Sequence, residues 1–201
     1  MNEFFGPLDS GCRVPPHQQT RVAAFLISAH GALARQFAFA LPLQLESAWQ
    51  TELNAQLYRE SEIVSLAMRA TRWVPDLALG YMTASWERAW LPAPIEGITD
   101  PSLALAAGLA ALAHAVHAGI RPAALLPVEV DANDPFAMAL RRIELESGRL
   151  LQAQIILLKG PNLVPFRDAV SAALERRHVE VRKLWAEALE GVGIVSRRSE
   201  S

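Results

Sequence analysis

Residues 100–120 read DPSLALAAGLAALAHAVHAGI, and this stretch decides the fold. Asp100 followed by Pro101 is typical of the N-cap and first turn of a helix, and Gly119 is a typical helix end. Leucine and valine side chains recur on one face, while alanines and a glycine leave the opposite face smooth. The ridge consists of Leu105, Leu109, Leu112 and Val116. Because small side chains permit close approach of neighbouring backbones, we expect a central helix packed on both sides.

The same stretch raises the question of a membrane span. From Pro101 to Ile120 there is no charged residue, and about 20 apolar residues suffice to cross a bilayer. However, eight of these residues are alanine, two are glycine and two are histidine, and these insert into lipid poorly compared with leucine, isoleucine or phenylalanine. We therefore expect a buried helix and no transmembrane segment.

The rest of the chain shows helical periodicity, interrupted by proline and glycine. Besides 101–119, helices are expected over 17–39, 43–73, 76–90, 135–158 and 165–190. Asp134-Pro135 repeats the cap signature of Asp100-Pro101, and residues 91–97 are expected to form a loop. The prediction is an all-α fold: a single compact bundle of about six helices with a long second helix.

The expected domain organisation follows from these elements. Residues 1–16 form an N-terminal extension, 17–191 the helical bundle, and 192–201 a frayed tail. The segment 120–134, rich in proline, is an irregular crossover and a possible sub-boundary. The last two helices, joined by a short turn at Gly160-Pro161, are expected to form an antiparallel hairpin.

Composition excludes several classes of protein. The 201 residues include 19 Lys+Arg and 21 Asp+Glu, so the chain is nearly neutral and we expect no nucleic-acid partner. The one cysteine, Cys12, excludes an intramolecular disulfide framework. The N-terminal residues lack the basic and apolar regions of a secretory signal. We expect a cytoplasmic protein.

Catalytic motifs are absent from the sequence. It contains no nucleophile elbow, phosphate-binding glycine loop, dinucleotide fingerprint or HExxH motif. Cys12 lies five residues before His17, but this spacing alone defines no catalytic arrangement. We therefore expect no cofactor and favour a protein that is not an enzyme.

Two groups of residues suggest a metal site as an alternative. Glu175 and His178 have the Glu-x-x-His spacing that di-iron carboxylate bundles use twice, but there is no second copy. His114 and His117 lie three residues apart on the alanine-rich helix and can share a metal, with His30 or His178 as a neighbour. The alternative function is thus a helical metal- or small-ligand-binding protein.

Aromatic residues favour a different function. Trp73, Tyr81, Trp86 and Trp90 are grouped around and after Pro75, and such rings are enriched in binding hot spots. The alternative is that they cap one end of the hydrophobic core. Leu91 and Ile95, in the following loop, are expected to be exposed. The leading hypothesis is a non-catalytic adaptor or accessory protein, acting through a protein partner or as a homo-oligomer.

Part of the chain resembles phasins, the amphipathic-helix proteins that coat polyester granules. The resemblance is carried by Glu52–Gln56, Trp73–Leu77 and Trp86–Ala89, and it does not extend over the alanine-rich helix or the C-terminal hairpin. It implies a third possible function, the coating of a lipid or granule surface.

Overall fold

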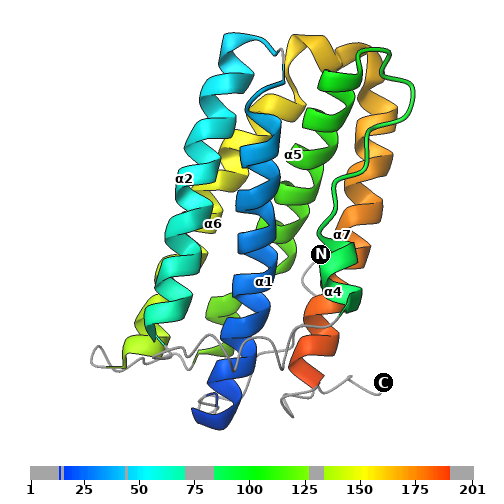
Figure 1. The fold of residues 1–201 in the computed structure, drawn as a ribbon. Helices are drawn as coiled ribbons and strands as arrows, with labels where there is room; N and C mark the ends of the chain where they lie inside the picture. The colour runs from blue at the N-terminus through cyan, green and yellow to red at the C-terminus, as the bar shows by residue number, and fades with distance from the viewer. Residues whose placement is uncertain (1–13, 15, 44, 71–83, 127–133, 191–201) are drawn as a thin grey trace.

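The computed structural model is an all-α bundle, as expected (Figure 1). It describes residues 14, 16–43, 45–70, 84–126 and 134–190. The helices there are α1 (Pro16–Ala40), α2 (Ser47–Ala70), α4 (Ala84–Ala89), α5 (Pro101–Gly119), α6 (Pro135–Leu158) and α7 (Arg167–Glu190). Two short 3₁₀ helices, η1 (Pro122–Leu125) and η2 (Pro161–Phe166), precede α6 and α7. These segments contain no β-strand.

The two Asp-Pro signatures start α5 and α6 at the predicted residues. The Oδ1 atom of Asp100 accepts hydrogen bonds from the backbone N–H groups of Ser102 and Leu103, at 2.8 and 3.2 Å. Asp134 does the same for Phe136 and Ala137, at 3.0 and 3.2 Å. Each carboxylate thus satisfies two backbone donors that would otherwise lack a partner in the first turn.

Helix α5 lies at the centre of the bundle, as predicted from its small residues. It contacts α6 and α7 along most of its length and also reaches α1, while α2 packs against α1 and α6. Helices α6 and α7 run antiparallel, as expected for the hairpin, but each packs mainly against α5, which separates them (Figure 1). Helices α1, α2, α5 and α6 therefore form a four-helix arrangement, and α7 packs on α5 and contributes buried side chains to the same core.

A glycine lets a loop pack directly on α5. A Cβ atom built on Gly108 would lie 2.0 Å from the carbonyl oxygen of Ala93, in the loop that precedes α5. The same loop donates the N–H of Ile95 to the carbonyl of Ala104, at 3.1 Å. The absent side chain therefore determines how closely this loop approaches the helix.

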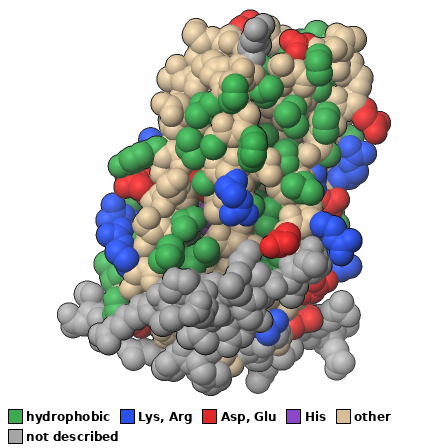
Figure 2. All heavy atoms as spheres, viewed as in Figure 1, with side chains coloured by type: hydrophobic (Ala, Val, Ile, Leu, Met, Phe, Trp, Pro, Cys, Tyr) green, Lys and Arg blue, Asp and Glu red, His purple; other side chains and the backbone are tan. Residues whose placement is uncertain are grey.

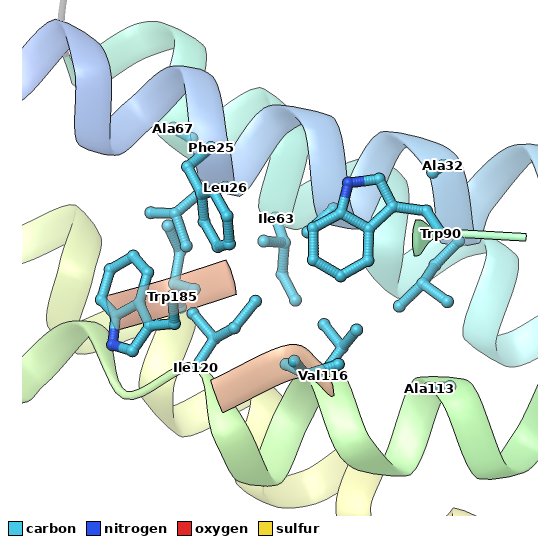
Figure 3. Close-up of a cluster of buried hydrophobic side chains, with 14 of the residues drawn as sticks. Phe25, Leu26, Ala32, Ile63, Ala67, Trp90, Ala113, Val116, Ile120 and Trp185 are labelled. Carbon is cyan, nitrogen blue, oxygen red and sulfur yellow. The ribbon is translucent and has the colours of Figure 1, made fainter. Parts of the chain in front are cut away.

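The largest core cluster is built around four aromatic rings, from α1, α7 and the end of α4. Phe25 of α1 contacts Trp86 and Trp90 edge-on, with ring centroids 4.9 and 5.6 Å apart, and Trp185 of α7 at 5.3 Å. Figure 3 shows Trp90 and Trp185 on opposite sides of Phe25, Leu26 and Ile63. The indole N–H of Trp90 donates to Ser28 Oγ at 3.1 Å, so its one polar group is satisfied in the interior.

This packing supports the core alternative for Trp86 and Trp90 and corrects the expected exposure of Ile95. Trp86 and Trp90 are only 4% and 1% exposed, and Ile95 is buried as well. The i, i+4 spacing of the two tryptophans does place them on one face, but that face points into the core. Leu91 is exposed, as expected, whereas Trp73 and Tyr81 lie outside the described residues.

Other segments differ from the sequence prediction in extent. Within the segment expected to be helical over 76–90, the described part is helical over Ala84–Ala89, and residues 71–83 lie outside it. The helix expected from Pro165 begins at Arg167, because η2 occupies the preceding residues. Residues 127–133 of the crossover expected over 120–134 also lie outside the described residues.

Two described helices are long and apolar enough to cross a membrane, by length and composition alone. They span Gln18–Ala40 and Pro101–Leu125, and 61% and 78% of their apolar windows are buried inside the bundle. Core helices of soluble proteins meet the same test, so the finding is weak evidence for either environment. The predicted absence of a transmembrane segment remains a prediction.

Substitution of Gly108 tests the loop contact. Gly108→Ala is expected to lower the free energy of unfolding by about 1–3 kcal/mol, because the new methyl group overlaps the Ala93 carbonyl. The control is Gly148→Ala in α6, where an added Cβ meets no atom within 4 Å. It should raise the stability by about 0.5–1 kcal/mol, the ordinary helix preference for alanine. Urea unfolding of both variants measures the difference, and equal effects would contradict this packing.

Candidate metal centre

The most unusual feature of the core is a buried carboxylate held between two histidines. Glu60 of α2 is fully buried, His30 of α1 is 1% exposed and His117 of α5 is 4% exposed. His30 Nδ1 lies 2.7 Å from Glu60 Oε2, and His117 Nε2 lies 2.8 Å from Glu60 Oε1. Each carboxylate oxygen thus faces an imidazole from a different helix. The face of the molecule in Figure 2 shows almost no histidine, in accord with this burial.

The sequence of α2 explains why a carboxylate points inward. The buried residues of this helix recur at alternating intervals of four and three: Trp49, Leu53, Gln56, Glu60, Ile63 and Ala67. This spacing forms one continuous stripe along a helix. The apolar stripe that the sequence suggests shares Trp49, Leu53 and Ala67 with this one but also takes in Leu45, Leu57, Val64 and Met68. Of these, Leu45, Leu57 and Val64 are half-buried and Met68 is 37% exposed. Glu60 was therefore missed, although the correct spacing passes through it.

The surroundings keep Glu60 ionised. Burial alone raises the pKa of this carboxyl group, but the charges and hydrogen bonds of His117 and His30 outweigh it and lower the pKa to about 2. The imidazole rings of His30 and His117 lie with their centroids 5.5 Å apart. Thus at neutral pH a negative charge resides in the interior, with an imidazole in contact with each carboxylate oxygen.

Atoms of this group still lack partners. His117 Nδ1 is buried and forms no hydrogen bond within the described structure. One turn from Glu60, Gln56 Oε1 accepts a hydrogen bond from Gln154 Nε2 of α6 at 3.2 Å, while Gln154 Oε1 has no partner there either. A buried polar layer therefore crosses the four-helix core, and it is not fully satisfied by protein atoms.

The three residues have the composition and geometry of a metal-ligand set. One ligand atom from each of His30, Glu60 and His117 lies within 4.8 Å of the other two. Two imidazoles and one carboxylate suit Zn²⁺ and other divalent first-row transition metals, and catalytic zinc sites use such a three-ligand set with a fourth position open. Within the described residues no other group of three potential ligands is this close together.

The metal residues predicted from the sequence divide between two places. His117 lies in the centre just described, together with His30, which the sequence suggested as a neighbour. His114 instead contacts His178, with 2.9 Å between Nδ1 and Nε2 and nearly parallel rings 5.0 Å apart. Glu175 is exposed on α7 and belongs to neither group. The four residues therefore do not form one site.

Burial affects the protonation of the second histidine pair. It lowers the pKa of His114 from 6.5 to about 4, together with the charges of His178 and His117. Burial and the nearby Arg182 also lower the pKa of His178. Both imidazoles are therefore neutral at pH 7, and one N–H donates to the lone pair of the other ring.

Comparisons with known proteins give no family or relative for this chain. No protein-family model matches it, and neither the curated proteins nor the solved structures contain a match.

The low pKa of His114 predicts a pH dependence of stability. The unfolded chain takes up a proton near pH 6.5, whereas the folded chain takes it up only near pH 4. The unfolded state thus binds more protons between these values, so stability should fall as pH decreases from about 6.5 to about 4. His114→Gln should reduce this fall, measured by urea unfolding at several pH values. If the His114→Gln variant loses stability with decreasing pH as much as the wild type does, groups other than His114 cause the loss.

Proposed function

We propose that this protein binds a divalent transition metal ion inside its helical bundle, through His30, Glu60 and His117. The observation that carries the proposal is the fully buried Glu60 carboxylate, with an imidazole nitrogen within 2.8 Å of each of its oxygens. Three helices contribute one ligand each, which is how bundles build metal sites from facing side chains.

The energetics of burial support a metal. A buried charge costs several kcal/mol unless its partners compensate it. The Glu60 carboxylate is fully buried and faces only the two imidazoles. A divalent ion bound by two neutral imidazoles and one carboxylate supplies positive charge at the position where the ligand atoms converge, and a water molecule can complete its coordination.

The chemistry of the ligands limits which metals fit. Imidazole suits zinc, iron, nickel and copper, and the carboxylate adds a hard oxygen donor, whereas calcium and magnesium prefer sites built from oxygen alone. We infer a preference for Zn²⁺ or Fe²⁺ over Ca²⁺ and Mg²⁺. The burial of all three ligands favours slow exchange of the ion over rapid capture and release.

The other two functions expected from the sequence stay predictions. An adaptor role would use surface residues such as Leu91, since Trp86, Trp90 and Ile95 are buried in the core. Coating of a lipid or granule surface, implied by the phasin resemblance, would use exposed apolar side chains. Cytoplasmic localisation likewise remains a prediction.

Metal binding is tested directly on the full chain. Protein purified without chelator is expected to contain about one zinc or iron per chain by mass spectrometry of the elements. Apo-protein should bind Zn²⁺ in competition with a chromophoric chelator and should gain thermal stability when the ion is added, because the ion binds only the folded state. A folded wild-type chain that binds none of Zn²⁺, Fe²⁺ or Co²⁺ would overturn the proposal.

A pair of variants separates this site from adventitious binding. Glu60→Gln keeps the size and shape of the side chain but removes its charge and replaces one acceptor oxygen by an amide NH₂ group, and it should weaken Zn²⁺ binding at least about 100-fold. The control, His114→Gln with His178→Gln, removes the second histidine pair and should leave the affinity unchanged. If Glu60→Gln does not fold, the absorption spectrum of Co²⁺ in the wild-type and control proteins still reports nitrogen and oxygen coordination. Loss of binding in the control alone would place the metal at His114 and His178.

A further inference from the structure

A separate pocket lies on the other side of α5, between the two C-terminal helices. It has a volume of about 540 Å³, which is within the range of roughly 300–1,000 Å³ usual for small-molecule sites. It is lined by the end of α6, by η2 and by the first turns of α7, and His114 of α5 also lines it. Its lining includes none of the three proposed metal ligands.

The arrangement of the helices explains the pocket. Helices α6 and α7 each pack against α5 and not closely against each other, so a space opens between their adjoining ends. Figure 1 shows η2 connecting these two ends at the top of the bundle. Leu163 of η2 is only 2% exposed and fixes this connection to the core. The backbone that encloses the pocket is therefore held in place by packing.

The walls of the pocket are mainly aliphatic. Six of its ten lining residues are leucine, isoleucine or valine: Ile155, Leu158, Leu163, Val164, Val170 and Leu174. Val164 is 52% exposed, although large apolar side chains usually avoid water. Such a surface gains free energy when an apolar chain covers it.

The charged groups of the pocket all have the same sign. Lys159 follows the last residue of α6, and Arg167 begins α7; both line the pocket. Neither forms an ion pair with a carboxylate of the described residues, and the lining contains no acidic side chain. Ser171 and His114 add polar groups, and His114 is neutral at pH 7 because burial lowers its pKa. The pocket thus combines an apolar wall with two cations at its edge.

The geometry points to a binding site for a single-chain amphiphilic carboxylate, such as a free fatty acid. Its tail would lie against the aliphatic wall, and its carboxylate would contact Lys159 and Arg167. Charge complementarity selects this ligand, because a cationic amphiphile would be repelled and a fully polar anion would leave the aliphatic wall exposed to water. The inference is independent of the proposed metal site, which uses none of the residues that line the pocket.

The probe for this site is dodecanoate, measured by isothermal titration calorimetry below its micelle concentration. We expect binding of one dodecanoate per chain. Dodecyltrimethylammonium, with the same tail and the opposite charge, and butyrate, with the same charge and a short tail, should each bind at least about tenfold more weakly. Equal affinity for the two long-chain ions would overturn the proposal, as would absence of dodecanoate binding.

Variants identify the residues involved. Lys159→Gln with Arg167→Gln should weaken dodecanoate binding at least about tenfold without weakening dodecyltrimethylammonium binding. The matched control, Arg176→Gln with Lys183→Gln, removes two exposed cations of α7 that do not line the pocket and should change neither affinity. An equal loss in the control would show that net charge alone attracts the anion.

A third variant tests the apolar wall. Ser171 is exposed and lines the pocket, so Ser171→Trp should fill it without disturbing the core and should abolish dodecanoate binding. Unchanged affinity in this variant would place the ligand elsewhere. Flotation of the protein with phosphatidylglycerol vesicles, without affinity for free dodecanoate, would also overturn the proposal, because it would make the ligand a membrane surface.

Discussion

The charge on Glu60 is the constraint on which the rest of the structure depends. A carboxylate without access to water is tolerated only where other groups replace its hydration, and here both of its oxygens are within hydrogen-bonding distance of imidazoles. These imidazoles come from α1 and α5, so three helices must meet at one height along the bundle. A shift of one helix by a single turn, about 5.4 Å, would separate the partners. Apolar packing is far less specific, since it tolerates many combinations of side chains. The polar contact therefore fixes the register that the apolar core alone leaves open.

Helix α5 makes this meeting possible because its side chains are small. Almost every residue from Ala106 to His117 is buried, which requires neighbours on all sides of the helix. Alanine and glycine bring these neighbours close, as the contact between Gly108 and the carbonyl of Ala93 illustrates. The two histidines of α5 are its only large polar groups, and they point to different neighbours: His117 to Glu60, and His114 to His178. One helix therefore carries residues of both the proposed metal centre and the pocket between α6 and α7.

Local signals in the sequence predicted the fold well, and contacts between distant segments were harder to predict. The bounds of α5 and α6 could be predicted because an Asp-Pro pair acts within its own first turn. The direction in which Trp86 and Trp90 point could not be predicted. Their spacing shows that they share a helix face, but it does not show whether that face meets the core or a partner. Glu60 was missed for a related reason: its interior position is stabilised by residues 30 positions before it and 57 after it. The histidines could be identified as candidate metal ligands by residue type. Their division into two pairs, His30 with His117 and His114 with His178, could not be predicted.

The order of the helices along the chain has a consequence for how the protein is made. Ribosomal synthesis proceeds from the N-terminus, so α1 and α2 emerge first and can bring His30 to Glu60. His117 follows only after another 57 residues. Until then one oxygen of the carboxylate lacks its imidazole, and water is the only available substitute. The hairpin of α1 and α2 must therefore stay hydrated and loosely closed during this interval. The arrival of α5 expels that water, so the final tightening of the bundle and the completion of its polar centre are the same event.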